Sequence, residues 1–312
     1  MSAEAAPQKT NKFSMKDVGT RFAAWWNGVE VSEKTDEENA HEGANLEVVE
    51  GGTSAKSDDK NEAILAATNL LWGNGRTSPL NDSIDDKLIG EIDLSKNHRV
   101  SVFGAESGAR LKKIINHQEV KVTNYESNAF LKQKCLEFVN SEKRAKSVSC
   151  EDFNGSPAKL PKNKADRLLI FLRGTSAEGA QAHVFSAARN LKPNGIGYWF
   201  DFFVPQNIQI GDKYSAPEGR EFISVEELSE TMDAAGLKII ADEDIGADFL
   251  NGFNKNQHKI KEDWENFQAQ LIKDGGIVAA NFALTQIMGW RARSDALKIG
   301  QLSLRKIVFC KV

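Results

Sequence analysis

Runs of apolar residues with two different spacings alternate along most of this chain. Short continuous runs rich in β-branched and aromatic residues are typical of buried strands, and apolar residues three or four positions apart are typical of amphipathic helices. Strands are expected at residues 100–103, 120–125, 147–150, 167–172, 196–204, 237–241 and 302–311. Helical patterns separate them, so we predict an α/β protein with a doubly wound, mostly parallel seven-stranded sheet.

A glycine turn follows the first predicted strand. The segment His98–Arg110 reads HRVSVFGAESGAR, in which the apolar strand stops at Gly104 and helical spacing resumes after Gly108. In an open α/β sheet this junction is where a nucleotide-like ligand binds, because glycines let the ligand approach the backbone and the helix N-terminus offers unpaired N–H groups. The turn is therefore the first candidate for a binding site.

Two N-terminal segments differ from the alternating pattern. In residues 1–30, apolar side chains form one helical stripe, which would pack on the rest of the chain, lie on a membrane surface or bind a protein partner. The stripe consists of Val18, Phe22, Trp25, Trp26 and Val29. Residues 31–60 are rich in Asp, Glu, Asn, Ser and Gly, and they are predicted to be a flexible acidic linker.

The main domain is expected over residues 61–312, with an insertion at 242–301. The insertion has a mostly helical pattern and several aromatic residues. We expect it to cap the carboxyl edge of the sheet, where ligands bind in such folds. The alternative is that its aromatic side chains only attach the insertion to the core, because aromatic residues bury large apolar areas anywhere.

Composition and charge narrow the functional classes. The 312 residues carry a net charge of −4, which gives no basis for nucleic-acid binding. The three cysteines are far apart and form no CxxC pair, so we expect a reducing compartment, no disulfide framework and no metal site. The first residues contain no apolar signal-peptide segment, and no apolar run is long enough for an integral membrane segment. The expected location is cytoplasmic.

Three motifs together resemble a known family. They are the turn RNLKPNG at 189–195, the segment FISVEEL at 222–228 with Ala235-Gly-Leu237 after it, and the loop LWGNG at 71–75 with Ser78-Pro79. From Ala63 to the C-terminus the chain resembles the class I S-adenosylmethionine-dependent methyltransferases, which have a Rossmann-like fold, and in particular the phosphoethanolamine and cyclopropane-synthase kinds. The resemblance implies methyl transfer from S-adenosyl-L-methionine to a small-molecule acceptor.

The resemblance also implies roles for individual residues. Glu126 would accept hydrogen bonds from both ribose hydroxyls of the cofactor, and Asp152 with Phe153 would hold its adenine ring. Without the resemblance, Glu126 is a solvated strand-end acid and Asp152 an ordinary turn residue. The implied cofactor-binding set is Gly104, Ala105, Gly108, Glu126, Ser127, Asp152, Phe153 and Leu172, and the implied substrate-binding residues are Arg173 and Trp72. No histidine stands where a base is expected, so no catalytic residue is assigned.

The sequence departs from the family pattern around the turn. Val102 replaces an acidic residue that contacts the amino-acid part of the cofactor, Glu106 replaces the middle glycine, and Arg76 replaces an aromatic residue of the loop. We expect the Glu106 carboxylate to cap the N–H groups of the following helix and to compete with the carboxylate of the cofactor.

Three functions therefore stay open. The first is an active methyltransferase, and the second is an inactive methyltransferase-like protein that binds or regulates a partner. The third, an NAD-dependent enzyme, fits less well because residues 104–108 do not follow the pattern G-x-G-x-x-G.

Overall fold

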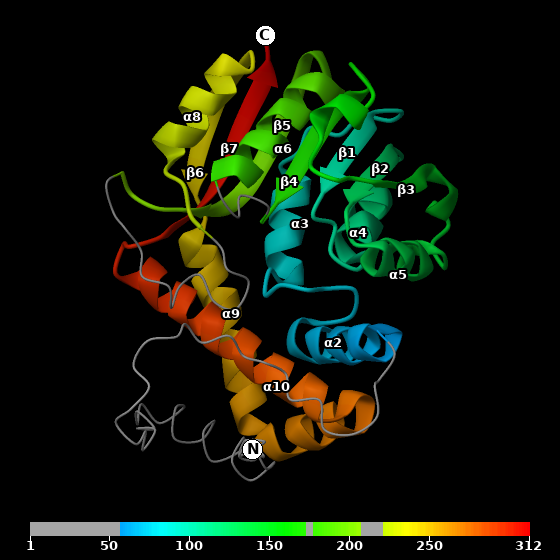
Figure 1. Ribbon diagram of the computed structural model, residues 1–312, viewed down its shortest axis with the longest axis vertical. Helices are drawn as coiled ribbons and strands as arrows, with labels where there is room; N and C mark the ends of the chain where they lie inside the picture. Colours follow the sequence, from blue (N-terminus) through cyan, green and yellow to red (C-terminus); the bar gives the residue numbers. More distant parts are fainter. Residues whose placement is uncertain (1–56, 173–176, 207–220) are drawn as a thin grey trace, which may run out of the picture.

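The computed structural model describes residues 57–172, 177–206 and 221–312 (Figure 1). The predicted N-terminal helix, nearly all of the predicted linker and Arg173 lie outside the described residues. Helix α2, at Ser57–Trp72, begins slightly before residue 61, where the main domain is predicted to start.

Seven strands form one sheet in the order β3-β2-β1-β4-β5-β7-β6. Neighbouring strands are parallel, except that β7 runs antiparallel to both β5 and β6. The strands are β1 Arg99–Phe103, β2 Lys121–Glu126, β3 Val148–Asp152, β4 Ala165–Phe171, β5 Leu191–Phe203, β6 Leu237–Asp244 and β7 Ser303–Lys311. The predicted mostly parallel, seven-stranded sheet is confirmed.

Hydrophobic cores cover both faces of the sheet. In β4, Leu169 and Phe171 belong to one core, and Leu168 and Ile170 belong to the other. Successive side chains of a strand point to opposite faces, so a strand that is buried on both faces has a continuous apolar run. Helices α3, α4 and α5 contribute to the first core, and α6 and α8 contribute to the second. The helices are α3 Asp82–Gly90, α4 Ala109–His117, α5 Ala129–Val139, α6 Ala177–Asn190 and α8 Val225–Ala234, with short 3-10 turns at Ala145–Ser147 and Pro157–Lys159.

Helix α8 begins with a capping box at Ser224 and Glu227. The Glu227 backbone N–H donates to the Ser224 hydroxyl at 3.1 Å, and the Ser224 backbone N–H donates to the Glu227 carboxylate at 2.7 Å. The two contacts satisfy N–H groups that have no partner inside the helix. The S-x-x-E motif thus has the structure that its sequence predicts.

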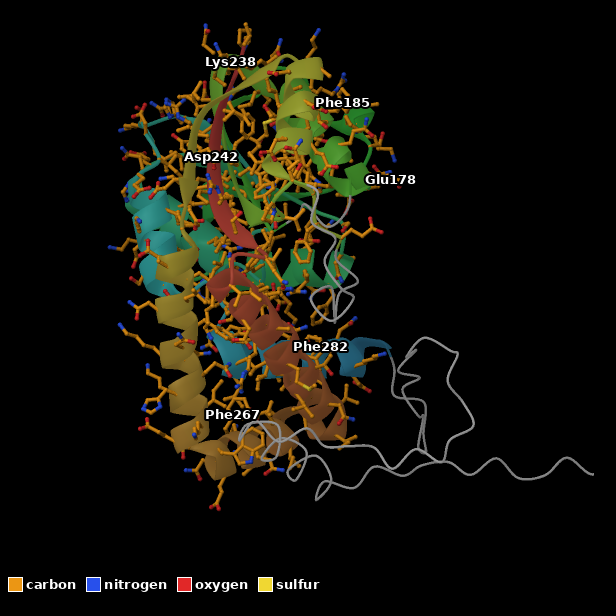
Figure 2. The ribbon with its side chains drawn as sticks, turned by 90° about the vertical axis from the view of Figure 1, so that its left-hand side faces the viewer. Glu178, Phe185, Lys238, Asp242, Phe267 and Phe282 are labelled. Atoms are coloured by element: carbon orange, nitrogen blue, oxygen red, sulfur yellow. The ribbon has the colours of Figure 1, made fainter. Side chains whose placement is uncertain are left out.

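Three helices lie beyond the carboxyl ends of the parallel strands (Figures 1 and 2). They are α2, α9 at Gly246–Glu262 and α10 at Trp264–Lys298, and the last two fall within the predicted insertion. Helix α2 packs closely on α10, because a Cβ on Gly275 would lie 3.0 Å from the Ala63 Cβ. These helices cover the sheet edge at which open α/β folds bind ligands.

The turn after β1 depends on a close approach between α4 and α5. Gly108, the residue before α4, has a φ of 119°. A Cβ on Gly108 would lie 2.8 Å from the Phe138 Cβ and 3.1 Å from the Cys135 carbonyl oxygen, both on α5. The turn therefore needs glycine here for its backbone conformation and for its packing.

We expect Gly108→Ala to lower the free energy of unfolding by about 1–3 kcal/mol more than Gly155→Ala does. Both glycines have positive φ, but a Cβ on Gly155 would meet no atom within 4 Å, so the control variant introduces backbone strain without overlap. Urea unfolding of both variants measures the difference. Equal losses would mean that packing against α5 does not require glycine at residue 108.

Candidate functional site

A cavity of about 340 Å³ lies at the carboxyl edge of the sheet, beneath α2 and α10. Its floor is the glycine turn and the end of β4, and its walls come from both helices, the loop after α2 and the residues after β2. The lining residues are Asn61, Ile64, Leu65, Thr68, Thr77, Ser78, Gly104, Glu106, Arg110, Asn128, Phe130, Leu131, Phe171, Leu172, Phe282, Gln286 and Trp290. Of the predicted site residues, Gly104 and Leu172 line this cavity.

A buried group of four charges lies beside the cavity. Arg76 pairs with Asp85 at 2.7 Å, and Arg110 pairs with Asp85 at 3.3 Å and with Glu106 at 3.2 Å. All four side chains are almost completely inaccessible to solvent. Removing charges from water is costly, so such a group is stable only when each charge has partners of opposite sign. We call these four residues the ion cluster.

Hydrogen bonds fix the ion cluster to the turn and to the loop. Arg110 donates to the Gly104 carbonyl oxygen at 2.8 Å, and Arg76 donates to the Leu80 carbonyl oxygen. The Ser78 hydroxyl donates to the Glu106 Oε1. The loop that carries Arg76 and Ser78 is thereby held closed over the turn.

Burial raises the pKa of Glu106 above its ordinary value, although Arg110 beside it acts in the opposite direction. Its second oxygen, Oε2, is buried and accepts no hydrogen bond, and Arg76 lies 3.8 Å from it. Glu106 also has a φ of 58°, which is uncommon for a residue with a side chain. The residue that departs from the family pattern thus lies at the contact between the turn, the loop and the cavity.

Glu106 does not cap helix α4, which corrects the prediction made from the sequence. The backbone N–H groups of Ser107 and Ala109 both donate to the Gly75 carbonyl oxygen, at 3.1 and 3.2 Å. The Glu106 carboxylate points to Ser78 and Arg110 instead, because these offer a hydroxyl and a full positive charge. Gly75 can approach this closely because it has no side chain: a Cβ there would lie 2.8 Å from the Phe138 ring.

Three other predicted cofactor residues, Ala105, Gly108 and Glu126, do not line the cavity. Ala105 is fully buried, and Gly108 packs on α5. Glu126 ends β2 with 2% of its surface exposed, and its Oε1 accepts hydrogen bonds from the backbone N–H groups of Ser127 and Asn128 at 2.9 and 3.1 Å. Glu126 is therefore a buried carboxylate, and the alternative of a solvated strand-end acid is wrong.

The predicted adenine residues lie at the end of β3, outside the cavity lining. Asp152 is on the surface, and its carboxylate pairs with Lys132 at 2.5 Å. The Phe153 ring is buried, with ring centroids 5.0 Å from Phe103 and 5.3 Å from His183. The structure places these two residues near Glu126, whose carbonyl oxygen accepts the Phe153 N–H at 3.1 Å.

Trp72 lies between the cavity and a second hollow of about 450 Å³ that reaches the start of α3 and the surface of α9. Its ring centroid is 6.3 Å from Phe253 on α9 and 6.5 Å from Trp290 on α10. Trp290, in turn, lines the cavity. Trp72 thus packs against the helices that cover the sheet edge. It does not line the cavity itself but contacts Trp290, which does.

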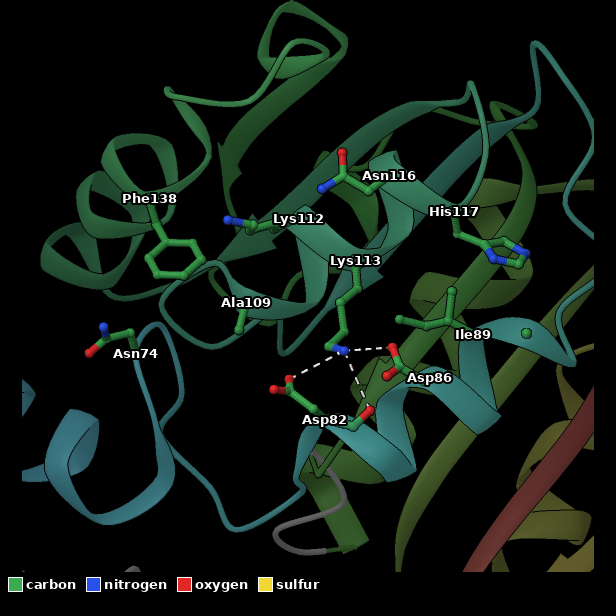
Figure 3. A pocket seen from close by; sticks show the side chains of 11 residues that line it. Asn74, Asp82, Asp86, Ile89, Ala109, Lys112, Lys113, Asn116, His117 and Phe138 are labelled. Carbon is green, nitrogen blue, oxygen red and sulfur yellow. Dashed lines mark hydrogen bonds and ion pairs between the residues drawn. The ribbon is translucent and has the colours of Figure 1, made fainter.

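A larger hollow of about 560 Å³ lies between α3, α4 and α5 (Figure 3). Its lysines are already paired: Lys113 contacts Asp86 at 2.5 Å and Asp82 at 3.2 Å, and Lys112 contacts Glu142 at 2.7 Å. Of its lining residues only Asn74 and Ala109 lie next to the glycine turn, and the others lie along α3 and α4 or on α5, so we do not assign the functional site to it.

Asp85 and Trp290 are site residues that the sequence pattern did not reveal. Asp85 lies between Ile84 and Asp86 in a short helix, and its pairing with two arginines is visible only in the fold. Trp290 was one of several aromatic residues in the insertion. Its spacing gives no signal that separates it from those that only pack.

Two kinds of site are absent from the described part of the chain. Over residues 57–172, 177–206 and 221–312, no three His, Cys, Asp or Glu side chains are arranged to hold a metal ion. Within the same ranges, no helix combines the length and the apolar character needed to cross a bilayer.

The raised pKa of Glu106 predicts a pH dependence of stability. The folded chain retains the Glu106 proton at pH values where the unfolded chain has lost it, so stability falls as pH rises from about 4.5 through the raised pKa. Relative to Glu106→Gln, the wild type should therefore lose free energy of unfolding over this window. Urea unfolding of both proteins from pH 4.5 to 8 measures this difference, and a constant offset between them would contradict the prediction.

Comparison with known proteins gives the fold. No protein-family model matches this sequence, and no curated protein sequence matches it. Among solved structures, a phosphoethanolamine N-methyltransferase 2 from Haemonchus contortus, in complex with phosphomonomethylethanolamine and S-adenosylhomocysteine, has a TM-score of 0.67 at 16% identity. The match covers 79% of this chain and 56% of that one, so this chain spans little more than half of that protein.

Two other structures are matched over nearly their whole length. A cyclopropane synthase from Mycobacterium tuberculosis has a TM-score of 0.60 at 12% identity, over 82% of this chain and 94% of that one. The [4+2]-cyclase SpnF has a TM-score of 0.59 at 16% identity, over 80% of this chain and 93% of that one. Such low identities show the fold alone. The predicted resemblance is confirmed at that level: this chain has the class I methyltransferase fold.

Proposed function

We propose that this protein transfers a methyl group from S-adenosyl-L-methionine to a small molecule bound in the cavity under α2 and α10. The observation that carries the proposal is the position of the cavity. It opens on the glycine turn at the carboxyl edge of a class I methyltransferase fold, where such folds bind their ligands. The Haemonchus enzyme of the same fold was solved with S-adenosylhomocysteine.

The residues at the ends of β2 and β3 fit the adenosine part of this cofactor. Glu126 is a buried carboxylate at the end of β2, and Asp152 and Phe153 follow on β3, with a backbone hydrogen bond joining the two strand ends. The amino-acid part fits only if the loop opens, because Gly75 now holds the Ser107 and Ala109 N–H groups. Arg76 and Arg110 would then be available to a carboxylate in place of Glu106.

When bound, the cofactor supplies an activated methyl group, so the protein's main tasks are to orient the acceptor and to exclude water. The covering helices would meet the second task, since Phe282 and Trp290 on α10 line the cavity together with residues of α2. Holding two reactants in one geometry accounts for a large part of enzymatic rate enhancement, and it requires no catalytic base.

We expect S-adenosylhomocysteine to bind the wild type with a dissociation constant of about 1–100 μM, and Glu126→Gln to weaken binding about tenfold. The loss would follow from replacing a charge-assisted acceptor with a neutral one. Isothermal titration measures both values, with Glu151→Gln on the neighbouring strand as the matched control and NAD as a comparison ligand. Equal affinities of the Glu126 and Glu151 variants would contradict the role given to Glu126, and tighter binding of NAD would contradict the choice of cofactor.

A second candidate function is an inactive methyltransferase-like protein. The closed turn favours it: Glu106 occupies the turn, Gly75 takes the N–H groups, and the ion cluster fixes the loop. Val102 also favours the second candidate, because it is fully buried beside Asn124 and Leu169 and has no acidic group that could contact a ligand. Such a chain would bind or regulate a partner without carrying out methyl transfer.

If the second candidate is right, Glu106→Gly will raise the affinity for S-adenosylhomocysteine at least tenfold. The change removes the competing carboxylate and leaves Arg76 and Arg110 sharing the buried carboxylate of Asp85, so a ligand carboxylate would restore the lost negative charge. We prefer this variant to Val102→Asp, because an acid at residue 102 would be buried in the sheet. Titration of the wild type, Glu106→Gly and Glu106→Gln separates the candidates: micromolar binding by the wild type favours the enzyme, and binding gained only by the glycine variant favours the inactive protein.

A further inference from the structure

Two of the three cysteines lie together between α5 and the sheet. Cys135, on α5, is fully buried, and Cys150, in β3, is partly exposed. The side-chain amide of Asn124, on β2, donates to both sulfur atoms, at 3.7 and 3.8 Å. The two thiols also form a hydrogen bond with each other. Cys310 is on β7, with four strands between it and β3, so only the first two cysteines form a pair.

The two thiols of the pair differ in reactivity. Their mutual contact lowers the pKa of Cys150 and raises the pKa of Cys135, and burial raises the pKa of Cys135 further. The thiolate is the form of cysteine that attacks a disulfide. Because β3 is at one edge of the sheet and Cys150 is partly exposed, a reagent can approach Cys150 from solvent. Cys150 therefore has the properties of an attacking thiol, and Cys135 lies behind it as a second thiol.

The pair is also connected to the glycine turn. The Cys135 thiol donates a hydrogen bond to the Glu106 carbonyl oxygen at 3.0 Å, and the backbone of Cys135 packs against Gly108. The side chain of Glu106 belongs to the ion cluster. A sulfur atom in a disulfide has no proton to donate, so oxidation of Cys135 would remove a hydrogen bond that joins α5 to the turn.

We propose that Cys135 and Cys150 are a reversible modification site, at which a small disulfide such as oxidised glutathione converts the two thiols into a disulfide. The Cys150 thiolate attacks one sulfur of the reagent, its S–S bond breaks, and one glutathione thiolate leaves. The Cys135 sulfur then attacks Cys150 in the mixed disulfide, and its proton passes to the second glutathione thiolate as this leaves. The protein loses two electrons, which reduce the reagent to two thiols. Reduced glutathione reverses both steps.

The first test maps disulfides in the full chain after incubation with oxidised glutathione at about pH 8. Free thiols are then alkylated, and the unreduced protein is digested with trypsin. The three cysteines fall in separate peptides, 135–143, 147–159 and 307–311. We expect peptides 135–143 and 147–159 to be linked in most molecules, and reduced glutathione to separate them. A stable glutathione adduct on Cys150 with Cys135 still alkylated, a link to peptide 307–311, or an unmodified Cys150 would each reject the proposal.

The second test asks whether the disulfide alters the turn. Backbone amides of residues 104–110 should exchange hydrogen about tenfold faster in the oxidised wild type than in the reduced wild type, because the turn has lost a contact with α5. Cys150→Ser treated with the same oxidant should show no increase, and Cys310→Ser should respond like the wild type. Equal exchange in the oxidised and reduced wild type would contradict the connection between the pair and the turn.

Both tests are made without cofactor or methyl acceptor, so their outcome is independent of the proposed function. A linked pair in a protein that does not bind S-adenosylhomocysteine would reject methyl transfer and retain this inference. Binding of S-adenosylhomocysteine by a protein whose Cys135 and Cys150 do not become linked would do the reverse.

Discussion

Two arginines and two carboxylates, buried together, hold the loop after α2 onto the turn after β1. Arg76 comes from the loop, Asp85 from α3, and Glu106 and Arg110 from the turn and the first residues of α4. Four elements therefore meet at one group of charges, and removing any one of these charges would leave the buried group with an uncompensated charge. The closed state of the loop and the shape of the cavity both depend on this arrangement.

The ion cluster also accounts for two of the departures from the family pattern, Arg76 and Glu106, because both residues belong to it. A glutamate at residue 106 would be unfavourable in an empty glycine turn, because it adds bulk and a negative charge. Arg76 and Ser78 on the loop compensate for both by binding its carboxylate. Gly75, in the same loop, supplies the carbonyl oxygen that satisfies two N–H groups of the turn. Arg76 and Glu106, which both depart from the family pattern, therefore contact each other.

The same contact decides what the site can do. In this structure the carboxyl edge of the sheet has a cavity lined by apolar and polar side chains, and the residues expected to hold an adenosine group lie outside its lining. Under the proposed function the loop would have to open, so that the turn N–H groups now bound to Gly75 become available to the carboxylate of the cofactor.

The sequence by itself determined the sheet, its order of elements and the capping of α8. Those features depend on local spacing: continuous apolar runs for buried strands, helical periodicity between them, and a side chain three residues from its partner. The position of Glu126 at the end of a strand was also predicted from the sequence, because it directly follows the apolar run at 120–125. Only the tertiary structure decided that the Glu106 carboxylate binds Ser78 and Arg110 rather than the backbone N–H groups at the start of α4. Ser78 is distant in sequence, and Gly75, which accepts two of those N–H groups, belongs to a loop without periodicity. Asp85 shows the same limit: nothing in the sequence around it indicates burial, and it is buried because two arginines from other elements converge on it. Pairwise charge contacts between distant segments leave no repeating pattern in a single sequence, so their existence became visible only when the fold brought the segments together.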